Sequence, residues 1–153
     1  MINLQPITSK NDDEICGLKA DGSLVRHNEG SLADAYVYWA EHGSAPIVYG
    51  IYNDETPVGL VMVAYFEDDD YDDTGVPYYF LWRLMIDESH QNKGYGREAM
   101  KLIMEEVKTF PKGEANAFYT STAGEAALKL YESCGFERTG QINGREVVLR
   151  LTL

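Results

Sequence analysis

Cysteines and long apolar runs are both scarce, and their scarcity excludes several classes of protein. Cys16 and Cys134 are the only cysteines among 153 residues, too few for a disulfide framework and not at metal-ligand spacing. No apolar run approaches the roughly 18 to 20 residues that span a bilayer. Residues 1–5 lack the basic and apolar regions of a secretory signal. We therefore expect reduced thiols in a cytoplasmic protein that does not enter membranes.

Positive charge is also scarce. Thirteen Lys and Arg residues face 25 Asp and Glu residues, giving a net charge of −12. A field of this sign repels nucleic-acid phosphates and attracts cations. No basic stripe is present, and His27, His42 and His90 are scattered without ligand spacing. We expect no nucleic-acid partner and no bound metal.

The periodicity of apolar residues predicts one domain over residues 1–153, of mixed α/β class. One helix is expected to start at a capping box over Ser31–Asp34 and to end near Glu41. A second follows Gly96 with Ala99, Leu102, Ile103 and Val107 on one face, and a third carries Ala126 to Tyr131 and ends before Gly135. Strands are expected over 2–7, 47–52, 58–66, 78–86 and 117–120, and on both sides of Asn143-Gly144.

The most informative segment is the turn between the buried run 78–86 and the second of these helices. Backbone N–H groups at a helix start have no partner inside the helix and favour an anion. Gly94 and Gly96 let a phosphate approach the backbone, and Lys93 and Arg97 add positive charge. The segment therefore predicts a pyrophosphate site, although such a turn is often only a tight connection. It lacks the spacing of a P-loop or a Rossmann fingerprint.

Two motifs in this order resemble the GNAT N-acetyltransferases. Gln91-x-x-Gly94-x-Gly96 is similar to the coenzyme A signature of that family. Ala127-x-x-Leu130-Tyr131-Glu132-x-x-Gly135-Phe136 is similar to its second signature. The resemblance implies a central mixed sheet of about seven strands flanked by about four helices, with acetyl-CoA as co-substrate and no metal.

A closer resemblance extends over almost the whole chain. The segment Ser31–Tyr36, the acidic run Glu67–Asp73, the pair Trp82-Arg83 and the tail Gly140–Val147 are similar to bacterial spermine/spermidine (diamine) acetyltransferases. This resemblance implies acetylation of a polyamine and a homodimer.

The family resemblance also implies site residues. Backbone groups of Leu84, Met85 and Ile86 would run along the pantetheine arm, and an N–H near Met85 would polarise the thioester carbonyl. Tyr131 would protonate the departing thiolate, the alternative being an ordinary core aromatic. Gly124 replaces an Asn that contacts the cofactor in many family members. The pyrophosphate would be held by the backbone of Gln91, Asn92, Lys93, Gly94, Tyr95, Gly96 and Arg97.

The substrate side is less determined by the sequence. Trp82 stands where animal diamine acetyltransferases carry a glutamate, so Glu67, Asp69 and Tyr79 are the candidates for substrate binding and for a water-mediated base. The acidic run is either a solvated loop or a grip for ammonium groups. Alternatives are another small amine, a peptide N-terminus, or a silent sensor that only binds acetyl-CoA.

Overall fold

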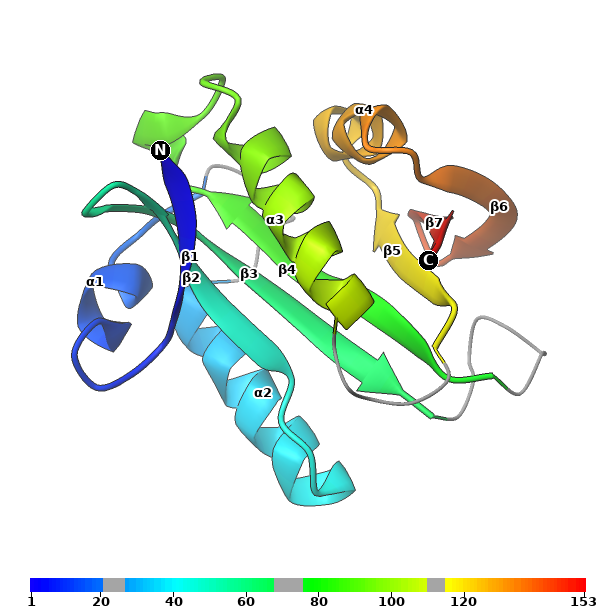
Figure 1. Ribbon diagram of the computed structural model, residues 1–153, viewed down its shortest axis with the longest axis horizontal. Coiled ribbons are helices and arrows are strands. Elements are labelled where there is room, and N and C mark those ends of the chain that lie inside the picture. The colour runs from blue at the N-terminus through cyan, green and yellow to red at the C-terminus, as the bar shows by residue number, and fades with distance from the viewer. Residues whose placement is uncertain (21–26, 68–75, 110–114) are drawn as a thin grey trace.

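The computed structural model describes residues 1–20, 27–67, 76–109 and 115–153. Seven strands form a single sheet in the order β1-β2-β3-β4-β5-β7-β6 (Figure 1). This confirms the predicted mixed α/β class. The strands are β1 Ile2–Pro6, β2 Ile47–Asn53, β3 Thr56–Phe66, β4 Tyr78–Ile86, β5 Ala117–Thr122, β6 Glu137–Asn143 and β7 Glu146–Thr152. The helices are α1 Asp12–Cys16, α2 Asn28–His42, α3 Tyr95–Thr109 and α4 Glu125–Ser133, with a short 3₁₀ turn, η1, at Glu88–His90.

The helices cover the two faces of the sheet in pairs. Helices α3 and α4 lie on one face, where Ile103 and Tyr131 join the largest apolar cluster with Leu81 and Phe118. Helices α1 and α2 lie on the other face, where Ile15 packs with Met85 (Figure 1). Every neighbouring pair of strands is antiparallel except β4 and β5, which are parallel.

Two helix predictions are wrong in detail, and tertiary packing explains both. Helix α2 begins at Asn28, not at Ser31, and Ser31 lies buried in its first turn with its N–H donating to the His27 carbonyl. Asn28 is buried as well and donates to the Ile15 carbonyl at 2.7 Å, which holds the extra turn against α1. On α3, Met100 is buried and Leu102 is 37% exposed, so the apolar stripe includes Met100 in place of Leu102.

The strands predicted over 47–52 and 58–66 pair as a hairpin, and so do the two predicted around Asn143-Gly144. Strands β2 and β3 pair up to Asn53 and Thr56, leaving a two-residue loop in which Asp54 has φ of 55°. In the tail, Asn143 pairs with Glu146, so the loop is Gly144-Arg145, one residue later than predicted. Gly144 has φ of 62°, a conformation that glycine adopts without strain.

No helix of the described residues is long and apolar enough to cross a membrane.

Candidate functional site

Strands β4 and β5 pair over a short stretch and then separate. Their register joins Tyr79 to Phe118, Phe80 to Tyr119 and Leu81 to Thr120, and the pairing ends there. On the β3 side, Val63 pairs with Leu81 and Met62 with Arg83, so Trp82 is the extra residue of a bulge. A bulge bends its strand and increases the local twist. The last five residues of β4, which include Leu84, Met85 and Ile86, therefore have an edge outside the β5 ladder.

Asp87 organises the turn that follows β4. Its carboxylate accepts from the Lys19 N–H at 2.8 Å and from the Ser89 N–H at 3.1 Å, and it also accepts from the Ser89 hydroxyl. The hydrogen bond from Ser89 and the backbone N–H groups of Lys19 and Ser89 lower the pKa of Asp87, against a smaller effect of burial. Further along the turn, Gln91 donates from Nε2 to the Ile86 carbonyl at 3.0 Å.

The start of α3 contains backbone N–H groups that no hydrogen bond inside the helix uses. Asn92 and Gly94 have φ of 62° and 82°, and the first helical hydrogen bond runs from the Glu98 N–H to the Gly94 carbonyl. The N–H groups of Tyr95, Gly96 and Arg97 precede that bond and so have no partner inside the helix. A Cβ on Gly94 would meet nothing within 4 Å. Glycine is thus required there for its backbone angle and not for space.

Gly96 differs from Gly94, because a side chain there would meet neighbouring residues. A Cβ built on Gly96 would lie 3.4 Å from Cδ2 of Leu130 on α4 and 3.8 Å from Cγ1 of Ile86 on β4. Gly96 therefore lies between the end of β4 and helix α4, beside the stretch of β4 that extends beyond the β5 ladder.

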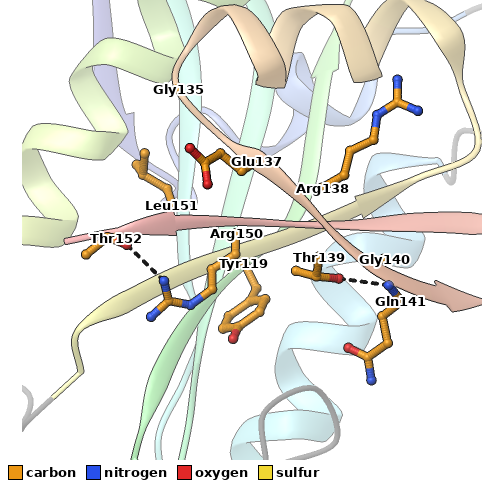
Figure 2. Close-up of a pocket in the computed structure, with 10 residues that line it drawn as sticks. All are labelled: Tyr119, Gly135, Glu137, Arg138, Thr139, Gly140, Gln141, Arg150, Leu151 and Thr152. Atoms are coloured by element: carbon orange, nitrogen blue, oxygen red, sulfur yellow. Dashed lines mark hydrogen bonds between the residues drawn. The ribbon is translucent and has the colours of Figure 1, made fainter.

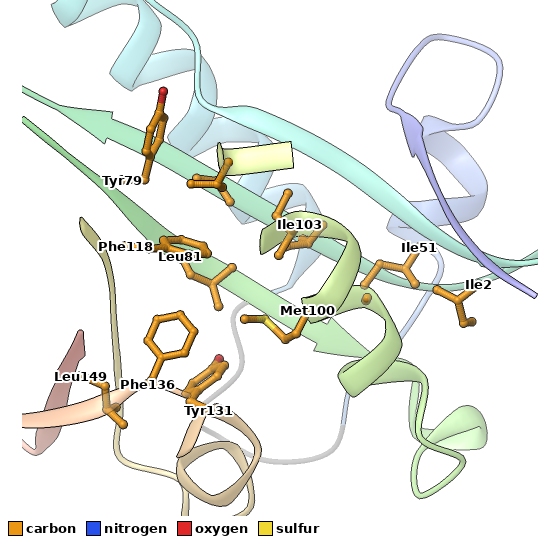
Figure 3. Packing of buried hydrophobic residues seen from close by; sticks show 14 of the residues in the cluster. Ile2, Ile51, Tyr79, Leu81, Met100, Ile103, Phe118, Tyr131, Phe136 and Leu149 are labelled. Atoms are coloured by element: carbon orange, nitrogen blue, oxygen red, sulfur yellow. The ribbon is translucent and has the colours of Figure 1, made fainter. Parts of the chain in front are cut away.

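Tyr131 lies at the point where the two strands diverge. It sits in the last turn of α4, which ends in a Schellman motif: the Phe136 N–H donates to the Tyr131 carbonyl and the Gly135 N–H to that of Glu132, both at 3.1 Å. The Tyr131 ring packs beside Phe136, 5.9 Å between centroids (Figure 3). The side chain of Thr120, the last residue of β5 paired with β4, lies next to the Tyr131 hydroxyl and itself donates to the Leu81 carbonyl at 3.3 Å.

Burial raises the pKa of Tyr131 to about 12, opposed by the neighbouring side chain of Thr120. Since the neutral phenol is favoured in the folded protein, its contribution to stability is complete below pH 10 and is lost as the pH rises towards 12. At pH 11 this loss is on the order of 1 kcal/mol. In the wild type, the free energy of unfolding measured with urea should fall between pH 9 and pH 11. In Tyr131→Phe this fall should be smaller by about that amount. Equal decreases in both proteins would contradict the assigned burial of the hydroxyl.

The candidate substrate residues are distributed over both faces of the sheet. Tyr79 is buried on the α3 face, with its ring 5.2 Å from that of Tyr65. Trp82 lies on the α2 face, with its ring 5.8 Å from that of Tyr38. Glu67 is exposed just after β3. Burial raises the pKa of Tyr38, and the charge of Glu67 raises it further. Asp69 and the rest of the acidic run lie outside the described residues.

A cavity of about 740 Å³ lies elsewhere, between β6, β7 and Tyr119 (Figure 2). None of the predicted site residues lines it. The guanidinium groups of Arg138 and Arg150 point apart there, and they do not converge on one ligand atom. We therefore place the site at the separation of β4 from β5.

Gly124 stands where many family members carry an Asn. Gly124 is the N-cap of α4 and supplies no side-chain cap, and a Cβ there would meet only Thr122 and Ala127 at 3.5 and 3.9 Å. The position thus has room for a Cβ. No group of three potential metal ligands occurs within the described ranges.

Comparison with known proteins gives consistent results. A family model described as "Acetyltransferase (GNAT) family" matches residues 12–136. A spermine/spermidine N(1)-acetyltransferase of Bacillus subtilis is 26% identical, over 97% of both chains. Among solved structures, Arabidopsis thaliana Naa50 in complex with a bisubstrate analogue is 18% identical with a TM-score of 0.69, covering 99% of both chains. The Bacillus subtilis N-acetyltransferase YlbP in complex with coenzyme A is 20% identical with a TM-score of 0.62, covering 100% of this chain and 96% of the other.

Proposed function

The chain belongs to the GNAT acetyltransferase family, whose members transfer an acetyl group from acetyl-CoA, and on this premise we propose that its acceptor is a polyamine such as spermine or spermidine. The proposal rests mainly on the acidic run Glu67–Asp73, which has six carboxylates in seven residues. The chain as a whole has a net charge of −12. The similarity to a spermine/spermidine acetyltransferase along 97% of the chain supports the same substrate class.

Acetyl-CoA would lie where β4 extends beyond the β5 ladder. On that edge, Leu84, Met85 and Ile86 would offer backbone groups to the pantetheine amides, the Ile86 carbonyl already accepting from Gln91, and Gly96 adds no side chain beside them. The N–H groups at the start of α3, with Lys93 and Arg97, would hold the pyrophosphate. An N–H of the same β4 segment would stabilise the charge that develops on the thioester oxygen.

In the reaction, the amine nitrogen forms a bond to the acetyl carbon and the carbon–sulfur bond breaks. The amine loses a proton to a base or a water chain, and the leaving thiolate needs a proton. Tyr131 is protonated at neutral pH because its pKa is about 12. Its hydroxyl, next to Thr120 where the β4–β5 pairing ends, would donate to the thiolate. Trp82 has no acid–base group, so Glu67, Asp69 and Tyr79 remain the candidates for the base.

The acidic run would act on the charges of the substrate that do not react. One exposed carboxylate–ammonium pair contributes only about 0 to 1 kcal/mol, but a polyamine makes several such pairs at once. Negative charge raises the pKa of an amine, whereas only the neutral amine attacks the thioester. The carboxylates would therefore hold distal ammonium groups, and the reacting nitrogen would lie beside the apolar β4 strand.

Neutralising the acidic run tests this proposal. Replacing Asp68, Asp69, Asp70 and Asp72 by Asn should raise the KM for spermine about fivefold and leave the KM for acetyl-CoA within about twofold. The difference should shrink between about 0.01 and 0.15 M salt, because the screening length falls from about 30 to 8 Å.

The matched control removes four exposed carboxylates from other elements, with Asp13→Asn, Glu55→Gln, Glu105→Gln and Glu137→Gln in one protein. It changes the net charge by the same amount, so it reports the effect of the overall field. Equal spermine constants for the two variants would show that the run has no special role. The acceptor would then have to be sought among other amines, including peptide N-termini.

A further inference from the structure

Arg83 contacts the backbone of β4 at its bulge opposite β3, just beyond the residues that pair with β5. Trp82 has no residue opposite it in β3, because the register passes from Val63–Leu81 to Met62–Arg83. An extra residue in a bulge is left out of the ladder, so its backbone groups need other partners. Arg83 donates from Nη1 to the Trp82 carbonyl at 2.8 Å.

The same guanidinium reaches across to helix α2. Its Nη2 donates to Oδ2 of Asp34 at 3.1 Å, and both side chains are 27% exposed. One planar group thus joins the bulge carbonyl to a helix 49 residues earlier in the chain. A lysine has a single charged nitrogen and cannot reproduce this fixed fork.

The position of this link in the sheet points to a role in the reaction. Trp82 is the first β4 residue beyond the last β4–β5 pair, and Leu84 and Met85 follow directly. The direction of their N–H groups depends on the backbone angles of the bulge. We propose that Arg83 is a positioning residue for acetyl transfer, which fixes the bulge so that the β4 backbone meets the thioester at the right angle. This inference rests on the proposed binding of acetyl-CoA where β4 extends beyond the β5 ladder.

The competing explanation is that Arg83 and Asp34 form an ordinary half-buried ion pair. Three variants separate the two explanations. Asp34→Asn removes the charge partner but keeps the bond from Arg83 to the Trp82 carbonyl. Arg83→Gln removes both contacts, and Arg83→Lys keeps the charge without the fork.

We expect kcat to fall about 10- to 100-fold in Arg83→Gln and Arg83→Lys, with both KM values within about threefold, since small misplacements near reacting atoms cost that much. Asp34→Asn should lower kcat less than about threefold. The control is Arg150→Gln on β7. Like Arg83, Arg150 lies over an aromatic ring of a strand. Its Cζ is 5.8 Å from the centroid of the Tyr119 ring, and the Cζ of Arg83 is 5.4 Å from the centroid of the Trp82 ring. This variant should keep wild-type kcat.

Amide hydrogen exchange of residues 82–86 in the ligand-free protein provides a readout that does not depend on turnover. Exchange in this segment should become faster in Arg83→Gln and Arg83→Lys, and remain near wild type in Asp34→Asn and Arg150→Gln. Unchanged exchange in both Arg83 variants would overturn the proposal, as would equal kcat losses in Asp34→Asn and Arg83→Gln. If the wild type transfers no acetyl group, the proposed function fails, while exchange still decides whether Arg83 holds the bulge.

Discussion

Replacing Tyr131 by phenylalanine is expected to lower kcat by about 10²- to 10⁴-fold, the usual contribution of a positioned acid. The hydroxyl is needed only as the thiolate leaves, so the affinity for acetyl-CoA should change less than about twofold. Kinetics with chemistry shown to be rate-limiting, together with calorimetric titration of acetyl-CoA, measure the two quantities separately.

The matched control for this variant is Tyr49→Phe. Burial, with a smaller contribution from a hydrogen bond to Glu106, also raises the pKa of Tyr49 to about 12. Tyr49 lies on β2, away from the separation of β4 and β5. It should keep a kcat within about twofold of wild type. If Tyr131→Phe retained most of its turnover, Tyr131 would be a core aromatic with no chemical role.

Gly96→Val is expected to weaken acetyl-CoA binding at least tenfold, or about 1.4 kcal/mol. Built on the present backbone, its Cβ lies 3.4 Å from Leu130, and its two methyl groups extend further into the space between β4 and α4. Calorimetric titration measures the loss directly, after circular dichroism has established that the variant is folded.

Gly96→Ala is the control for folding and for the size of the side chain. Its Cβ makes only van der Waals contacts at 3.4 and 3.8 Å, so it should bind acetyl-CoA within about threefold of wild type. A folded Gly96→Val that binds as tightly as wild type would place the cofactor away from this space.

The sequence predicted most of the fold because its signals are local. Periodicity located β4 at the correct residues, and Gly135 marked the end of α4, where a φ of 97° favours glycine. The capping box at Ser31 was misleading, because burial of Asn28 and Ser31 against α1 and the sheet extends α2 by a turn.

The site was predicted less completely, because part of it depends on contacts between distant segments. Asp87 was not foreseen as the residue that organises the turn, since one of its partners is the N–H of Lys19, 68 residues earlier. The link from Arg83 to Asp34 likewise joins two elements whose packing no local pattern reveals. The cytoplasmic location and the homodimer remain predictions.

Thiol release from acetyl-CoA by the wild-type protein, measured over a panel of amines, tests the central claim most directly. We expect release that requires an amine, with kcat/KM for spermine and spermidine above that for a monoamine of equal length and above that for a peptide N-terminus. Amine-dependent release with the peptide or the monoamine preferred would contradict the polyamine assignment and leave acetyl transfer intact. Tight binding of acetyl-CoA with no release for any amine would contradict the account as a whole and indicate a protein that only senses the cofactor.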